Sequence, residues 1–367
     1  MRIKDICSGV TDGSHNPPQG LENSDYLMLS SKNVFDDKIT FDSPRYLSQI
    51  DFEQESKRTR IKSGDVLLTI VGTVGRAAVV GENMPQFTLQ RSVAVLHPNV
   101  EICDSRYLMY ALQANRNHIE SRAKGVAQKG IYLKEVADIE LQIPLLSEQT
   151  HRVKVLDKIA FVIKFHQKQL QKLDELIKAR FVELFGDPIS NPNGWKTEKA
   201  EMYIDLCSGF PFDSSQYTES GVNICGGLII MPQRIEWNDC KHWCSTEGYE
   251  EYTLKKNDIV IALDRPWISE GFKIAMVDTE HLPALLIQRT ARIRAIDINQ
   301  FYLMYCFLLG GFDNHCNVTG SLVPHISAKD IRSFPIMLPP MGLQEQFAAF
   351  VEQVNKSKLL QFFCFPI

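Results

Sequence analysis

The segment CKHWC at 240–244 carries three side chains that can bind zinc: Cys240, His242 and Cys244. A structural zinc site usually takes four ligands, commonly from paired Cys and His spacings. No second pair with such a spacing stands out in the sequence. We therefore interpret these three as ordinary residues and predict no metal site.

Two other segments resemble phosphate or nucleophile motifs only in part. GTVG at 72–75 is glycine-rich, but a phosphate-binding loop needs Gly-Lys-Ser/Thr opening a helix, and Arg76–Val80 continues as a strand. The scattered Ser, His and Asp residues form no G-x-S-x-G pattern. GTVG is therefore predicted to be a turn, and no catalytic residue is predicted.

HNPPQG at 15–20 is similar to the Asn-Pro-Pro-aromatic tetrapeptide of amino-methyltransferases, in which the aromatic residue stacks on a flipped-out base. Gln19 stands in the aromatic position, and we find no glycine-rich cofactor loop after a strand. Methyl transfer by this chain is therefore disfavoured. The neighbouring residues 12–15 are interpreted as a surface turn with available polar side chains.

The composition describes an ordinary soluble globular protein. The 367 residues suggest two or three domains, with 44% hydrophobic and 23% charged residues. No apolar run is long enough to span a membrane, and Arg2, Lys4 and Asp5 do not introduce a signal peptide, so we expect a cytoplasmic protein without a membrane partner. The nine cysteines lack paired spacing and fit reduced thiols. A net charge of −4 argues mildly against nucleic-acid binding.

A long helix is predicted from about residue 147 to 185. Ser147 can cap its start after Pro144, and Glu148 lies in its first turn. Apolar residues then recur at heptad spacing, as in a coiled-coil seam, although His166 and Arg180 interrupt it. The seam consists of Leu156, Ile159, Ile163, Leu170, Leu173, Ile177 and Leu184.

The two halves of the chain repeat each other at an offset of roughly 195 to 200 residues. Six pairs of segments recur in the same order: CSG at 7–9 and 207–209, 62–80 and 255–277, 89–96 and 287–294, 106–112 and 301–307, 125–144 and 320–339, and the helix that follows each. Within a unit the pattern is mostly β, with strands at 65–70 and 76–80 joined by a turn. Short helices are expected at 106–115 and 302–309, and a linker rich in Gly, Pro and Asn at 185–195.

Four segments carry a family resemblance: GDVLLTIVGTVGRAAVV (64–80), IPLLSEQ (143–149), LQKLDELIKARFVELFGDP (170–188) and LPPMGLQEQ (338–346). Over essentially its whole length the chain resembles the specificity subunit of type I restriction-modification systems. The resemblance implies an α+β fold with two mainly β target-recognition domains, separated by long coiled-coil spacer helices in a pseudo-twofold repeat. The expected ranges are 1–144 for the first domain, 145–187 for the first spacer helix, 188–340 for the second domain and 341–367 for a second, apparently truncated spacer helix.

The resemblance also implies a function. Each domain would read one half of a bipartite site in double-stranded DNA, with the helices as a ruler. The subunit has no catalysis and no cofactor of its own. It would dock modification subunits, which bind S-adenosylmethionine and methylate adenine, and a restriction subunit that translocates and cuts DNA.

Side chains with paired donors or acceptors are the ones that read bases, and they lead the candidates for DNA contact. In the first domain these are Ser14, His15, Lys57, Arg58, Arg76, Gln90, Arg91, Lys124, Gln128 and Lys129. In the second they are Arg265, Trp267, Lys273, Gln288, Arg289, Ser321 and His325. The pairs Gln90-Arg91 and Gln288-Arg289 are expected at matched places. The residues do not define the base sequence that is read.

Two alternatives belong to other functional classes. One is a methyltransferase or nuclease that supplies its own recognition domain, against which the missing aromatic at Gln19 and the missing cofactor loop speak. The other is a coiled-coil adaptor without DNA contact, for which the basic residues between 147 and 181 would be a solvated helix face.

The second helix is expected to begin near Leu343 and to be short. After Lys358 the chain reads LLQFFCFPI, without charge, and is interpreted as an abrupt truncation or a changed reading frame. A short antiparallel partner would leave part of the seam uncovered at Leu170, Leu173, Ile177 and Leu184. We therefore expect self-association through the incomplete spacer, unless residues 359–365 fold back onto it.

Overall fold

The computed structural model describes residues 1–124, 129–320 and 323–364, with side chains as far as Lys358. Gln128 and Ser321 lie outside the described residues, and the expected folding back of 359–365 depends on side chains that are not described. The chain divides into two compact units, Met1–Lys164 and Phe165–Ile367, which are described separately below. None of the helices in the described part of the chain is both long enough and apolar enough to cross a membrane.

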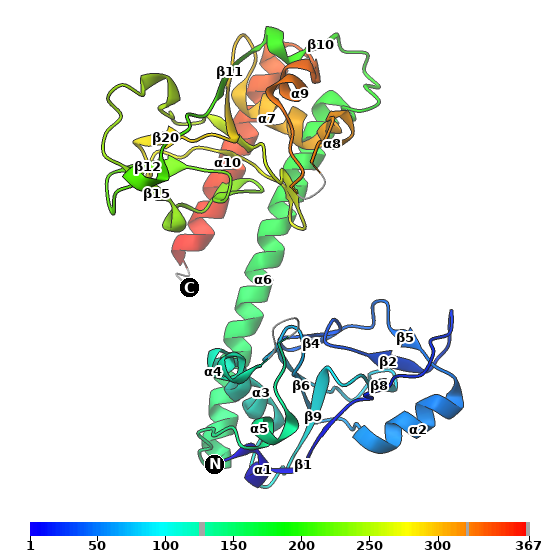
Figure 1. Cartoon of the computed structure of the whole chain (residues 1–367). Coiled ribbons are helices and arrows are strands. Elements are labelled where there is room, and N and C mark those ends of the chain that lie inside the picture. Colours follow the sequence, from blue (N-terminus) through cyan, green and yellow to red (C-terminus); the bar gives the residue numbers. More distant parts are fainter. Residues whose placement is uncertain (125–128, 321–322, 365–367) are drawn as a thin grey trace. The chain divides into compact units, whose positions relative to one another are not determined.

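The first unit is built on an antiparallel sheet with strand order β1-β9-β6-β7 and a smaller sheet with order β5-β2-β8 (Figure 1). In the smaller sheet, β2 pairs with β8 in parallel. Its elements are α1 (Ile3–Ile6), β1 (Cys7–Asp12), β2 (Leu27–Leu29), β3 (Val34–Phe35), β4 (Lys38–Ile39), β5 (Arg45–Tyr46), α2 (Gln49–Thr59), β6 (Val66–Thr69), β7 (Ala77–Val79), β8 (Phe87–Leu89), β9 (Val93–Pro98), α3 (Ser105–Ala114), α4 (Arg116–Arg122), α5 (Leu133–Ala137) and the start of α6 (Leu146–Phe185).

The central strands β6 and β9 are apolar on both faces because each face is covered. Val66 and Leu68 point to a core shared with α3, α5 and Val153 of α6. Leu67 points to the other core, which contains Leu29 of β2. Successive strand residues alternate between faces, so a strand buried on both sides must be apolar throughout. The predicted strands at 65–70 and 76–80 are confirmed as the antiparallel pair β6 and β7.

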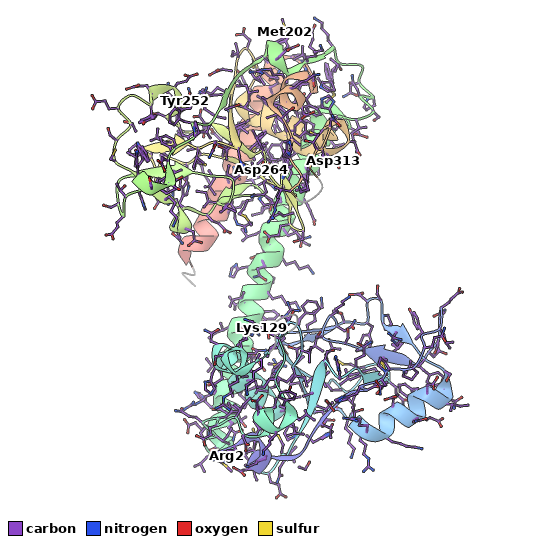
Figure 2. The ribbon with its side chains drawn as sticks, in the orientation of Figure 1. Arg2, Lys129, Met202, Tyr252, Asp264 and Asp313 are labelled. Carbon is purple, nitrogen blue, oxygen red and sulfur yellow. The ribbon has the colours of Figure 1, made fainter. Side chains whose placement is uncertain are left out.

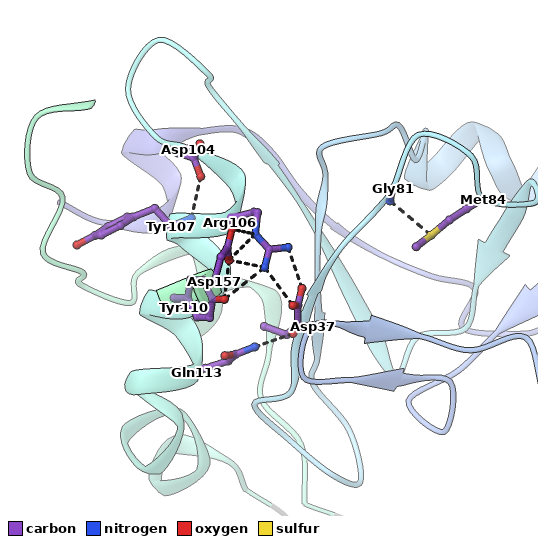
Figure 3. Close-up of polar contacts among 10 residues, drawn as sticks. Asp37, Gly81, Met84, Asp104, Arg106, Tyr107, Tyr110, Gln113 and Asp157 are labelled. Carbon is purple, nitrogen blue, oxygen red and sulfur yellow. Dashed lines mark hydrogen bonds and ion pairs between the residues drawn. The ribbon is translucent and has the colours of Figure 1, made fainter. Parts of the chain in front are cut away.

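Polar contacts fasten α6 to the first unit. The buried Gln149 accepts a hydrogen bond from the backbone N–H of Asp104 at 2.8 Å and donates to the carbonyl oxygens of Ile102 and Pro144. Arg106 of α3 donates from Nε to Asp157 of α6 and from Nη1 to Asp37 at 3.0 Å, as Figure 3 shows. The first turns of α6 are therefore part of the folded unit.

The second unit repeats this design. Its antiparallel sheet has the order β11-β21-β16-β19, and its smaller sheet has the order β15-β12-β20, with β12 and β20 parallel. Its elements are β10 (Thr197–Lys199), η1 (Ala200–Met202), β11 (Ile204–Ser208), η2 (Ser214–Gln216), β12 (Val222–Cys225), β13 (Ile230–Met231), β14 (Arg234–Ile235), η3 (Trp237–Asp239), β15 (Lys241–Trp243), η4 (Glu250–Tyr252), β16 (Ile259–Ala262), β17 (Trp267–Ile268), β18 (Gly271–Phe272), β19 (Ile274–Met276), β20 (Ala284–Leu286), β21 (Thr290–Ala295), α7 (Gln300–Leu309), α8 (Phe312–His315), α9 (Ala328–Ser333), β22 (Pro335–Met337) and α10 (Met341–Cys364).

The strand registers give the residue-by-residue correspondence between the units. Val93 lies opposite Thr69 of β6, and Thr290 lies opposite Ala262 of β16. Strands β9 and β21 therefore correspond at an offset of 197 residues, the difference between 290 and 93, and strands β6 and β16 at an offset of 193, the difference between 262 and 69. Carrying the offset of 197 along β9 places His97 at the position of Arg294. Both pair with a buried aspartate, at 2.8 Å for His97–Asp65 and 2.6 Å for Arg294–Asp258.

This register corrects two predicted matches. Gln90 corresponds to Ile287 and Arg91 to Gln288, so the two Gln-Arg pairs are out of step by one residue. Asp12 pairs with Ala94 and Ser208 pairs with the matching Ala291, so Gly209 corresponds to Gly13, not to Gly9. At both Gly13 and Gly209 an added Cβ would overlap the carbonyl oxygen of the neighbouring strand, which explains the glycine.

The predicted long helix is confirmed as α6, which has 40 residues, and the predicted short helices as α3 and α7. The predicted gap in the seam is wrong. Ile177 is fully buried, and Leu173 and Leu184 pack against the core of the second unit with Val351 and Val354 of α10. Phe347 packs against Phe185, whereas Lys358, later in α10, forms an ion pair with Asp174, earlier in α6, so the two helices run antiparallel here.

The exposed part of the seam lies instead in the first half of α6. Leu156 is 36% exposed and Ile159 is 50% exposed, whereas Ile163 and Leu170 are half-buried. The difference arises because α10 begins beside the end of α6, where Phe347 packs against Phe181 and Phe185. Helix α10 therefore covers the seam in the second half of α6.

Candidate functional site

Each unit has a hollow beside its smaller sheet, and the two hollows occupy matched positions. In the first unit the hollow is about 350 Å³ and is lined by Met28, Ser30, Lys32, Asn33, Ser43, Pro44, Arg45 and Gln90. In the second unit it is about 550 Å³ and is lined by Tyr217, Ile224, Gly226, Gly227, Leu228, Ile229, Asp239, Cys240, Lys241, Asp264, Arg265, Lys273, Ile287, Gln288, Arg289 and Val323.

Strand pairing establishes the match. Met28 lies opposite Arg45, and Ile224 lies opposite Lys241. The turn after β2 is closed by a hydrogen bond from the Asn33 N–H to the Ser30 carbonyl at 2.9 Å. In the second unit the Ile229 N–H donates to the Gly226 carbonyl at 3.1 Å. Lys32 and Leu228 are therefore the corresponding residues at the tips of these turns.

A second feature shared by both units is a loop closed by paired backbone hydrogen bonds. Lys124 and Gly130 exchange two such bonds, and so do Thr319 and His325. Lys129 on the first loop is exposed, and Lys124 forms an ion pair with Glu135 at 3.2 Å. The backbone of Asp264 forms an isolated β-bridge with that of His325. Asp264 and Lys129 are labelled in Figure 2.

The Asp12–His15 segment is largely buried, which corrects its interpretation as a surface turn. Asp12 accepts from Arg58 Nη2 at 2.5 Å and lies 2.7 Å from Nε2 of His15. Ser14 is also buried, and its N–H donates to the Leu89 carbonyl. The close approach of Gly13 to the neighbouring strand draws this segment inward, so Arg58 and His15 are held in one cluster by Asp12.

The other candidates of the first unit are dispersed. The guanidinium of Arg76 lies 5.0 Å from the centre of the Phe35 ring, where it makes a cation–π contact. Lys57 and Arg91 are exposed, and Gln90 is half-buried in the wall of the hollow. These residues remain predicted DNA contacts.

The hollow of the second unit brings four candidates together: Arg265, Lys273, Gln288 and Arg289. Arg289 donates to Asp264 at 2.7 Å, and Gln288 and Arg265 are exposed. Arg265 has a left-handed backbone with φ of 44°, at the position that Gly72 occupies with φ of 83° in the first unit. Keeping a side chain in that strained conformation favours a role for it at this place.

Lys273 and Trp267 differ from the other candidates because they face inward. The ammonium of Lys273 donates to the Gly227 carbonyl, and its burial, together with the nearby charge of Arg265, lowers its pKa. Trp267 stacks on Phe272 with ring centres 5.2 Å apart and packs against the core. His325 is exposed, and its Nε2 lies 2.6 Å from the Thr319 hydroxyl.

Most of the lining residues were absent from the sequence-based candidates, among them Lys32 and Arg45 in the first unit and Leu228, Lys241 and Ile287 in the second. The lining of each hollow comes from segments that are far apart in sequence, and in the first unit the pairing of β2 with β5 and β8 brings these segments together. The zinc candidates make ordinary contacts, such as Cys240 Sγ donating to Asn223 at 3.3 Å. Within the described residues no group of three His, Cys, Asp or Glu side chains is placed to hold a metal.

Comparison with known proteins identifies the family. The model of the type I restriction modification DNA specificity domain matches residues 2–175 and 244–361. The chain belongs to this family, as the resemblance in its sequence indicated, and the predicted α+β fold class is confirmed.

Individual relatives agree with this assignment. The MjaVIII specificity subunit of Methanocaldococcus jannaschii is 24% identical over 318 residues, which are 82% of this chain and 74% of that protein. The EcoAI specificity subunit of Escherichia coli is 29% identical over 182 residues, 47% of this chain and 31% of that protein. Among solved structures, the S subunit of a type I restriction-modification system from M. genitalium has a TM-score of 0.55 at 14% identity, with 98% of this chain and 89% of that chain covered.

Proposed function

We propose that this chain reads a bipartite site in double-stranded DNA, with one half-site for each unit, and so gives sequence specificity to a type I restriction-modification complex. The observation that carries the proposal is the repeated fold with two matched hollows. Each unit has its own core and its own strand-lined site, so each can recognise DNA independently.

Local positive charge supports DNA contact despite the net charge of −4. Phosphate contacts from Lys and Arg provide most of the affinity of a DNA-binding protein and position it on the duplex. Exposed cationic side chains are present in each unit near the candidate sites: Lys32, Arg91 and Lys129 in the first, and Lys241, Arg265 and Arg289 in the second.

The partners follow from the family. The relatives are named as specificity subunits of type I restriction enzymes. Modification subunits that bind S-adenosylmethionine and methylate adenine, and a restriction subunit that cuts DNA, are the partners we propose for this chain in the cytoplasm. No cofactor and no catalytic residue are assigned to the chain itself.

The first half of α6 is the surface that we propose a modification subunit covers. Val155, Leu156, Ile159 and Val162 are between 36% and 50% exposed. Exposed neighbouring apolar side chains mark interaction surfaces. Without the partner, we expect the chain to self-associate through them. Light scattering at micromolar concentrations would show oligomers of the wild type and a monomer of the Leu156→Lys, Ile159→Lys variant. A monomeric wild type would contradict this part of the proposal.

Mapping methylated adenines in DNA from cells that carry the complete system tests the proposed function. We expect one two-part sequence whose methylation disappears when this chain is deleted. The alternative of a self-contained methyltransferase predicts transfer of labelled methyl groups to DNA by the purified chain alone. We expect no transfer above background until modification subunits are added.

A further inference from the structure

The two matched hollows differ in character at two corresponding lining positions. At the tip of the turn the first unit has Lys32 and the second has Leu228. On the wall formed after β8 and β20, the first unit has Gln90 and the second has Ile287. The same fold position is therefore polar in one unit and apolar in the other.

In the first unit, hydrogen bonds of the Asn33 side chain hold the turn that carries Lys32. The Asn33 Oδ1 accepts from the Ser30 N–H at 3.1 Å, and its Nδ2 donates to the Asp42 carbonyl at 2.9 Å, which fixes the turn. Lys32 is exposed at the tip of that turn. The side chains of Lys32 and Gln90 form no hydrogen bond with the residues that the structure describes, so their donors are free for a ligand.

In the second unit an apolar wall stands beside cationic side chains. Leu228 is 91% exposed, and Ile229 and Ile287 continue its surface into the hollow. The exposed cations around the hollow are Lys241, Arg265 and Arg289. Two carboxylates also line it: Asp264, which pairs with Arg289 at 2.7 Å, and Asp239. An apolar wall beside cations suits a ligand that carries both a phosphate and an apolar group.

We propose that these hollows distinguish the bases of the two half-sites by different chemistry, an inference that rests on the proposed function. In the first unit, Lys32 and Gln90 donate hydrogen bonds to base edges in the major groove. In the second, Leu228 and Ile287 contact the C5-methyl group of a thymine, while Arg265 approaches the phosphates. Lys and Gln are suited to purine edges, and apolar side chains to the thymine methyl.

Reciprocal exchange of the lining residues tests the proposal. One variant carries Lys32→Leu and Gln90→Ile, and the other carries Leu228→Lys and Ile287→Gln. The full chain with its modification subunits would select sites from a random double-stranded DNA library. Each variant should change the preferred base in one half-site only, by about tenfold, and the two variants should change different halves.

Deoxyuridine provides a direct probe of the methyl contact, because it differs from thymidine only by lacking the methyl group. Replacing each thymine of the selected site by uracil should weaken wild-type binding about fivefold at one position, within the half-site that the Leu228→Lys, Ile287→Gln variant alters. That variant should bind the two DNAs equally. Equal binding of both DNAs by the wild type would overturn the methyl contact.

Controls separate folding from recognition. Glu101→Gln and Glu247→Gln alter exposed residues that do not line either hollow and should select the wild-type site. If an exchange variant melts at a lower temperature, the single changes Lys32→Gln and Leu228→Ala at exposed positions replace it. A wild type that enriches no two-part site contradicts the proposed function itself. A wild type that enriches one, with variants that select the same bases, contradicts this inference alone.

Discussion

Gln90 and Ile287 occupy the same position in their respective units. The Gln90 N–H donates to the Leu29 carbonyl at 2.9 Å, and the Ile287 N–H donates to the Cys225 carbonyl at 3.2 Å. Leu29 is the last residue of β2, which pairs in parallel with β8, the strand just before Gln90. Cys225 is likewise the last residue of β12, which pairs in parallel with β20, the strand just before Ile287. The backbone is therefore repeated while the side chain differs, as a scaffold for reading two different half-sites requires.

Replacing Gly13 or Gly209, which occupy the same position in their units, should destabilise the fold. An added Cβ would overlap the carbonyl oxygen of Leu89 or Ile287, both of which belong to backbone that cannot move aside freely. We expect Gly13→Ala and Gly209→Ala each to lower the free energy of unfolding of its unit by about 2 kcal/mol in urea denaturation.

Gly342 is the matched control for this substitution. It lies in the first turn of α10, and nothing lies within 4 Å of an added Cβ. Gly342→Ala should leave stability unchanged or raise it by about 0.5 kcal/mol. Equal losses at all three glycines would show that the close strand contact is not the cause.

The Arg106–Asp157 pair should stabilise the first unit in a pH-dependent way. Partial burial alone would raise the pKa of Asp157, but hydrogen bonds from Arg106 and Tyr110 outweigh burial and lower it. A carboxylate whose pKa is lower in the folded state stabilises above its unfolded pKa, and this contribution is lost as the pH falls through the folded pKa.

We therefore expect Asp157→Asn to reduce the free energy of unfolding by about 1 kcal/mol at pH 7, a modest value because both side chains are more than a third exposed. The difference from the wild type should shrink below about pH 4. Urea denaturation across this pH range measures it, with Glu120→Gln, an exposed position on α4, as the control. A difference that grows on acidification would contradict the assigned ion pair.

Two cations of the second hollow should differ in their effect on salt dependence. Arg265 is exposed, whereas the Lys273 ammonium is buried and donates to the Gly227 carbonyl. Arg265→Gln should reduce the slope of log affinity against log salt concentration by about 1, because one phosphate contact is lost. Lys273→Gln should leave the slope unchanged. A reduced slope for Lys273→Gln but not for Arg265→Gln would show that Lys273 makes the phosphate contact, and would contradict the role assigned to Arg265.

The sequence predicted the elements whose signal is local. Seven-residue spacing from Leu156 to Leu184 predicted α6, and the short β-branched run at 65–70 predicted the strand β6. The coverage of the seam was not predictable in the same way. It depends on where Phe347 docks against Phe181 and Phe185, which is a contact between residues more than 160 positions apart.

The hollows were missed for a related reason. The shared dipeptide Gln-Arg suggested that Gln90 matches Gln288, but the hydrogen-bond register places Ile287 there. Aligning the two halves by sequence favours identical residues, whereas strands correspond through the register of their backbone hydrogen bonds. A shift of one residue in that register changes which side chain faces the site. Lys32 and Leu228 are different residue types, so the sequence repeat did not show that they occupy corresponding positions.

Independent reading of the two half-sites is tested most directly by exchanging residues 188–340 for the matching segment of a family member with a different target. Methylated adenines would then be mapped in DNA exposed to the complete complex. We predict that one half of the methylated sequence changes to that of the donor while the other half is kept. A change in both halves, or in neither with methylation retained, would contradict the assignment of one half-site to each unit.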